Sequence, residues 1–107
     1  MANLKPAILF QALGDPTRRE IFERLVKGPQ AVVDLSAGLR VSRPAVSQHL
    51  KVLKDAGLVL LEQRGTRHLY QLAPEGVTAM RDYLDRLWDA ALVSFKAAAE
   101  KAQKGEK

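Results

Sequence analysis

The side chains best suited to chemistry lie in residues 41–57. If this segment is a helix, one side carries hydrogen-bonding and basic groups: Arg43, Ser47, Gln48, Lys51 and Lys54. Arginine and glutamine can form paired hydrogen bonds with base edges in the major groove of DNA, and serine can reach a base or a phosphate. Lysine suits phosphates, which supply affinity but little sequence information. The pattern favours a helix that reads DNA over the plainer alternative, an amphipathic helix with a solvated basic face.

The ends and the apolar side of the same segment support the helix. Ser42 is a suitable N-cap residue, and Pro44 is tolerated in a first helical turn. Both side chains are small, so the backbone could approach a groove closely. Gly57 can end the helix after about Ala56. The predicted inward stripe, at helical spacing, is Val46, Leu50 and Leu53.

Further elements are predicted on both sides. Short helices are expected over residues 7–13, about 16–27 and 31–38, and Asp15 is expected to cap the second of them. Two strands, 58–64 and 67–72, flank a turn at Gly65 and Thr66. His68, Tyr70 and Leu72 share one side of the second strand, and His68 is expected to be structural. A long amphipathic helix follows from Pro74. The predicted fold class is mainly α with a small β-hairpin, a winged helix-turn-helix of order α-α-α-α-β-β-α.

Composition narrows the classes of protein. The 107 residues fit one domain, and 47% hydrophobic with 27% charged residues is typical of a globular protein. Residues 40–67 hold six basic and two acidic side chains, so most of the net charge of +5 is clustered, as in nucleic-acid binders. The absence of cysteine excludes disulfides, thiol redox chemistry and cysteine-based metal sites. No signal peptide or membrane span is recognisable, so we expect a cytoplasmic location and no membrane partner.

Three motifs carry a family resemblance: LGDPTRR at 13–19, SRPAVSQHLKVLKDAGL at 42–58 and RGTRHLY at 64–70. They resemble the ArsR/SmtB family of bacterial winged helix-turn-helix repressors, and the likeness extends over roughly residues 4–95. The resemblance implies a homodimer that represses transcription at an inverted-repeat DNA operator. Residues 1–95 would form the winged helix-turn-helix domain with dimerisation helices at both ends. Residues 96–107 would be a basic helical extension or a disordered tail.

The resemblance also implies where the functional residues lie. The first and last helices would build the dimer interface, with the candidates Ile8, Leu9, Tyr83, Leu84, Leu87, Trp88, Ala91, Leu92 and Phe95. The tip of the hairpin would reach the minor groove or its phosphates. His49 would either position its helix or contact a phosphate. The DNA-binding set is therefore Ser42, Arg43, Pro44, Ser47, Gln48, His49, Lys51, Lys54, Arg64, Thr66 and Arg67.

The chain departs from the family pattern at the sensing sites. Many relatives carry a Cys-x-Cys pair before an Asp-Leu, but here Ala31, Val32 and Val33 precede Asp34 and Leu35. Other relatives carry histidines on the last helix, whereas this helix has the carboxylates Asp82, Asp85 and Asp89 and no histidine. We therefore expect no metal site and no cofactor. The effector, whether organic ligand, protein or none, stays open.

Two alternatives from other classes also stay open. The same basic surface would suit an architectural protein that binds DNA without sequence preference. The apolar last helix and basic tail would suit a winged-helix module that binds another protein. An enzyme is not expected, because the sequence holds no nucleophile–base constellation, phosphate-binding glycine loop or metal cluster.

Overall fold

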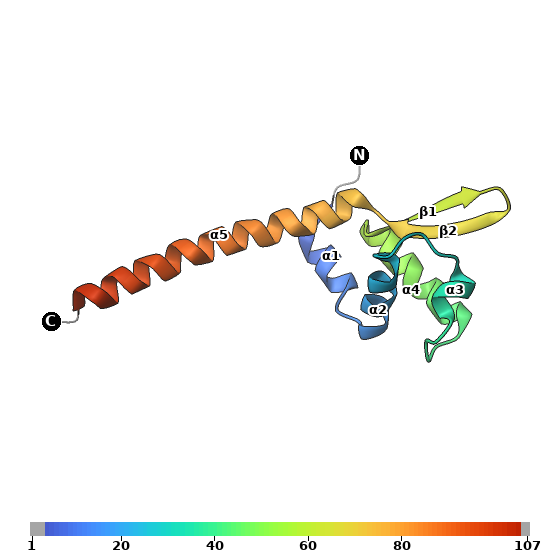
Figure 1. The fold of residues 1–107 in the computed structure, drawn as a ribbon, viewed down its shortest axis with the longest axis horizontal. Coiled ribbons are helices and arrows are strands. Elements are labelled where there is room, and N and C mark those ends of the chain that lie inside the picture. Colours follow the sequence, from blue (N-terminus) through green and yellow to red (C-terminus); the bar gives the residue numbers. More distant parts are fainter. Residues whose placement is uncertain (1–3, 106–107) are drawn as a thin grey trace.

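The computed structural model describes residues 4–105 (Figure 1). In this part of the chain, helices and one two-stranded antiparallel sheet follow the predicted order. The elements are α1 (Pro6–Ala12), α2 (Pro16–Leu25), α3 (Val32–Ser36), α4 (Arg43–Ala56), β1 (Val59–Arg64), β2 (Arg67–Leu72) and α5 (Pro74–Gly105). The predicted fold class, a mainly α winged helix-turn-helix, is confirmed. Residues 1–3 of the predicted domain and 106–107 of the predicted tail lie outside the described residues.

Local sequence signals set the ends of two helices. Asp15 precedes α2, and its carboxylate accepts a hydrogen bond from the Arg18 N–H at 2.9 Å. Ser42 precedes α4, and its Oγ accepts a hydrogen bond from the Ala45 N–H at 3.3 Å. At the other end of α4, Gly57 has a φ of 93°, in the left-handed region that favours glycine. Ser42 and Gly57 therefore hold the two ends of α4, the helix whose sequence pattern predicts DNA reading.

The cap at Asp15 makes the stability of the protein depend on acid pH. The hydrogen bond from the Arg18 N–H, assisted by the charge of His49, lowers the pKa of the Asp15 carboxyl. A carboxyl with a lowered pKa in the folded state stabilises the fold above its ordinary pKa, and this contribution is lost as pH falls through the lowered value. Asp15→Asn keeps a capping oxygen without titrating. We therefore expect the variant to lose less stability on acidification in denaturant unfolding. If variant and wild type lost equal stability on acidification, Asp15 would not be the source of this pH dependence.

The core lies where α1 to α4 meet the base of the hairpin. The inward stripe of α4 is fully buried, as predicted, and it packs with leucine and isoleucine side chains of the other helices. The fully buried large side chains are Leu9, Ile21, Leu25, Leu35, Val46, Leu50, Leu53, Leu58 and Val59. Burying one such side chain is worth about 1.5–3 kcal/mol. The stripe therefore fixes the rotation of α4 about its axis and keeps its polar side outward.

The hairpin differs from the prediction at His68. His68 is exposed, whereas its neighbour Leu69, on the opposite face, is buried. Arg67 shares the face of Leu69 and lies 3.7 Å from the Asp34 carboxylate of α3. This face is therefore turned toward α3 near the tip, while Tyr70 packs on the core from the other face. Tyr70 and Leu72 pack against the core, but His68 lies nearer the tip and is exposed, so the prediction that His68 is structural is wrong.

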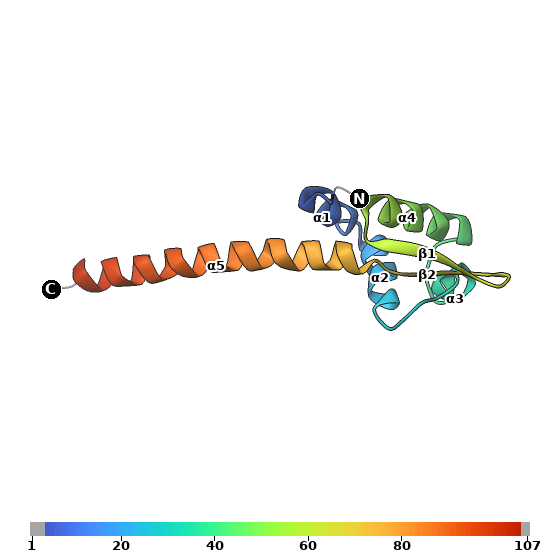
Figure 2. The same cartoon turned by 90° about the horizontal axis from the view of Figure 1, so that it is seen from above.

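Helix α5 begins against the body and then projects away from it (Figures 1 and 2). The Phe10 ring of α1 packs against the Tyr83 ring, with centroids 5.6 Å apart. Beyond this contact the helix continues to Gly105, and the molecule extends 71 Å along its longest axis. Among the described residues, no helix combines the length and apolar character that a membrane span requires.

Candidate nucleic-acid interface

The outward side of α4 is exposed along its whole length. The predicted side chains all lie on the surface: Ser42, Arg43, Pro44, Ser47, Gln48, Lys51 and Lys54. Arg43 and Ser47 lie in the first turns, and Lys51 and Lys54 lie toward the C-terminal end. An exposed helix side with hydrogen-bonding groups first and ammonium groups later has the chemistry to enter a major groove between two phosphate strands.

One acidic residue on α4 was missed by the sequence reasoning. The Lys51 ammonium donates a hydrogen bond to the Asp55 carboxylate, one turn further on, at 2.7 Å. This hydrogen bond raises the pKa of Lys51. The i, i+4 spacing could have indicated the pair. To bind a phosphate, the Lys51 ammonium would exchange a carboxylate partner for a phosphate partner.

His49 lies at the inward edge of α4, where its side chain is half-buried. The largest cause of the lowered pKa of Asp15 is the Arg18 N–H, and the charge of His49 adds to it. His49 is thus placed near the start of α2, within its own subunit. Both roles predicted for His49, positioning of its helix and a phosphate contact, stay predictions.

The wing arginines also have carboxylate partners that were not foreseen. Arg64 Nε donates to Glu62 Oε1 at 3.0 Å, and this hydrogen bond lowers the pKa of the Glu62 carboxyl. Arg67 lies 3.7 Å from Asp34 of α3. Both guanidinium groups and Thr66 are exposed at the tip. The tip is therefore accessible to a nucleic acid, but its positive charge is partly balanced within the molecule.

Comparison with known proteins matches the segment that contains α4 to a family. Residues 15–60, from the cap of α2 into β1, match the arsR family of bacterial regulatory proteins. The chain is 57% identical over 90 residues to the HTH-type transcriptional regulator Rv2034 of Mycobacterium tuberculosis, covering 84% of each chain. The chain belongs to the ArsR family. It is therefore a DNA-binding transcriptional regulator and not an enzyme.

Two further similarities support the ArsR assignment. The arsenical resistance operon repressor of Staphylococcus xylosus is 33% identical over 104 residues, which span 97% of this chain and 96% of that protein. A homodimeric winged helix-turn-helix DNA-binding domain from Mycobacterium bovis, Mb0332, superposes with a TM-score of 0.63 at 29% identity and 80% coverage of each chain.

The surface proposed for dimerisation from the ArsR resemblance is largely exposed. The large apolar side chains at about half exposure or more are Ile8, Leu84, Leu87, Trp88, Leu92 and Phe95. Tyr83 and Ala91 are half-buried, Tyr83 against Phe10. Leu9 is a correction, because it is completely buried in the core of its own subunit and cannot reach a partner. The neighbouring position, Ile8, carries the exposed side of α1 instead.

The positions that hold metal ligands in many ArsR relatives carry other side chains here. Ala31 precedes α3, and Val32 and Val33 form its first turn, with Val33 exposed. On α5, the carboxylates of Asp82, Asp85 and Asp89 are exposed. Within residues 4–105, no group of three or more histidine, cysteine or acidic side chains is arranged to hold a metal ion.

Proposed function

We propose that the protein is a homodimeric, sequence-specific repressor that binds an inverted-repeat operator through α4 and the wing. The observation that carries this proposal is the outward side of α4, where Arg43, Ser47 and Gln48 stand exposed on a helix held by a fully buried opposite side. Repressors among the relatives, such as that of Staphylococcus xylosus, support the repressing role. A repressor that binds chromosomal DNA in a bacterium would be located in the cytoplasm.

The apolar side of α5 supports the homodimer. Leu84, Leu87 and Trp88 are each at least half exposed, which is costly for a helix surrounded by water. A second copy would cover these side chains, and the similar Mycobacterium bovis domain is homodimeric. Two copies would place two α4 helices on one face of DNA. The half-sites would then lie about 34 Å, one helical turn, apart.

We also propose that the family's usual metal sites do not control this protein. Thiolates, which those sites use on α3, are missing from all 107 residues, and α5 has no histidine. The exposed carboxylates of α5 suit a solvated face. Control would then come from an organic ligand, a protein or no effector.

The test is a binding titration of the purified protein against the DNA upstream of its own gene and a scrambled duplex. It is run at two salt concentrations, with and without zinc. A preference for the upstream DNA that zinc leaves unchanged is the expected result. Equal binding that collapses at the higher salt would favour the architectural alternative, because phosphate contacts alone give steep salt dependence. No DNA binding together with a stoichiometric protein partner would favour the interaction module.

Two substitutions on α4 should separate base reading from phosphate binding. Arg43→Ala is expected to cost about 1–3 kcal/mol on the operator and to leave binding to scrambled DNA nearly unchanged, because the guanidinium reads a base edge. Lys51→Ala is expected to weaken binding to both duplexes alike and to reduce the salt slope by about one. Each variant serves as the control for the other in the same titrations. An equal loss on both duplexes for Arg43→Ala would overturn its assignment as a base reader.

A further inference from the structure

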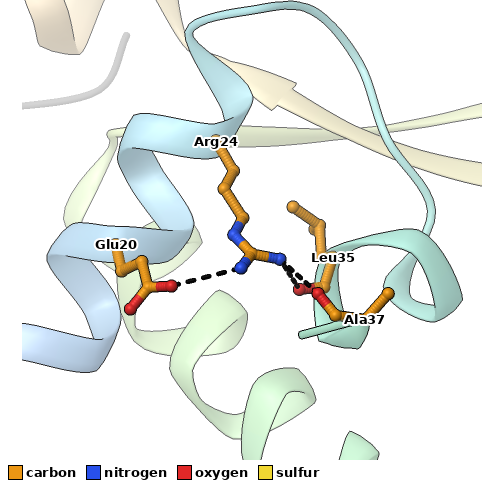
Figure 3. Close-up of polar contacts among 4 residues, drawn as sticks. All are labelled: Glu20, Arg24, Leu35 and Ala37. Carbon is orange, nitrogen blue, oxygen red and sulfur yellow. Dashed lines mark hydrogen bonds and ion pairs between the residues drawn. The ribbon is translucent and has the colours of Figure 1, made fainter. Parts of the chain in front are cut away.

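A single arginine joins the C-terminal end of α3 to α2 (Figure 3). Arg24 Nη1 donates to the carbonyl oxygens of Leu35 at 3.0 Å and Ala37 at 2.6 Å. Its Nη2 donates to the Glu20 carboxylate at 3.2 Å, one turn earlier on α2. The Arg24 side chain is 30% exposed. Its hydrogen bond to Leu35 is partly buried, and those to Ala37 and Glu20 lie at the surface.

These carbonyl groups need a partner. Carbonyls at the end of a helix have no partner within it. In α3, local donors bond the carbonyls of Asp34 and Ser36, and Arg24 supplies the donor for those of Leu35 and Ala37. Ala37 leaves the helical conformation, with ψ at 123°, and Gly38 follows with a φ of 82° in the left-handed region. The turn toward α4 begins there. A guanidinium on the last carbonyls holds the point where the chain leaves α3 for α4, and its positive charge suits a helix C-terminus.

The backbone of the same residue is linked to the wing. The Arg24 carbonyl accepts a hydrogen bond from Gln30 Nε2 at 2.9 Å. The Gln30 backbone pairs with Tyr70 of β2 in both directions, N–H to carbonyl, at 2.9 and 2.8 Å. Arg24 therefore bonds directly to the end of α3, which leads into α4, and is linked to β2 through Gln30.

We propose that Arg24 is a positioning residue that sets the placement of α4 relative to the wing, and so the fit to two grooves at once. It acts through the carbonyls of Leu35 and Ala37 and touches no DNA itself. The proposal rests on the sequence-specific binding proposed above. Its consequence is that losing the guanidinium loosens the α3–α4 turn and lowers the preference for operator over scrambled DNA.

The first test needs no DNA and so does not depend on the proposed function. In hydrogen exchange of the whole protein, Arg24→Met is expected to speed exchange of the amides in residues 35–39 about tenfold, because opening of this turn becomes easier. Core amides around Leu50 should keep their rates. Arg19→Met, which removes an exposed arginine from the same helix, is the matched control and should change neither. Unchanged exchange in residues 35–39 would overturn the proposal.

The second test measures binding to operator and scrambled DNA below the melting temperature of each variant. Arg24→Met is expected to lower the operator preference about tenfold at an unchanged salt slope. Arg24→Lys keeps the charge but cannot form the forked hydrogen bonds, so its operator preference should lie between those of Arg24→Met and the wild type. A slope reduced by about one would overturn the proposal in favour of a direct phosphate contact. If Arg24→Met does not fold, Arg24→Lys decides, and a wild-type preference in that variant would overturn it.

Discussion

Replacing Leu87 with aspartate is expected to convert the protein into a monomer and to lower its affinity for a two-half-site operator about hundredfold or more. Leu87 lies in the middle of the apolar side of α5 and is 50% exposed in the single subunit. A carboxylate at this position would lose its water when a second copy covers this side of α5, without a cation to pair with it. Without the dimer, each α4 binds one half-site and the linkage between half-sites is lost.

The experiment combines sedimentation with operator titration, and it has a matched control on the same helix. Val93 is also apolar and is 70% exposed, but helical spacing places it on the opposite side of α5. Val93→Asp makes the same chemical change and should stay dimeric with full operator affinity. If Leu87→Asp were still dimeric, α5 would not be the interface. If it were monomeric with undiminished affinity, the two-half-site model of binding would be wrong.

Gly76→Ala is expected to lower the free energy of unfolding by about 3 kcal/mol or more, because no space exists for a methyl group. Gly76 is buried in the first turn of α5, and a Cβ there would collide with the carbonyl oxygen of Gly57 and lie 3.2 Å from the Leu58 Cα. Both obstacles are backbone, so no side-chain rotation relieves the clash. The start of α5 would have to move off the end of α4.

Denaturant unfolding at a fixed protein concentration measures this effect, since dimerisation contributes to apparent stability. Gly105→Ala is the control at the far end of the same helix, where the described residues place no atom within 4 Å of the added Cβ apart from chain neighbours and the helix's own backbone. It should leave stability unchanged or slightly raised, because alanine favours helix. Equal stability of Gly76→Ala and wild type would show that α5 can approach α4 differently.

The features that the sequence predicted correctly depend on near neighbours along the chain. Asp15 and Ser42 cap helices because a side-chain oxygen reaches an amide three residues later. The two sides of α4 follow from a repeat of 3.6 residues, so Leu50 points inward and Ser47 outward in any fold that buries one side of this helix. The motifs at the turns and in the wing are equally local.

Two missed ion pairs, Lys51 with Asp55 and Arg64 with Glu62, are local, but the other missed features depend on pairs far apart in sequence. Leu9 and Ile8 are equally apolar neighbours, and only the packing of α1 decides that Leu9 enters the core while Ile8 stays at the surface. The ion pair of Arg67 with Asp34 and the contacts of Arg24 with α3 likewise join different elements.

The sequence by itself determined the order of the elements, the caps and the outward side of α4. The tertiary structure alone decided which face of the hairpin meets α3, why residue 76 must be glycine, and that Asp34 accompanies Arg67 of the wing. The physical reason is the distance along the chain between the residues that interact. Caps and periodicity need only the hydrogen bonds and apolar burial of neighbouring turns, whereas close approach of backbones and cross-element ion pairs exist only once distant segments have packed together.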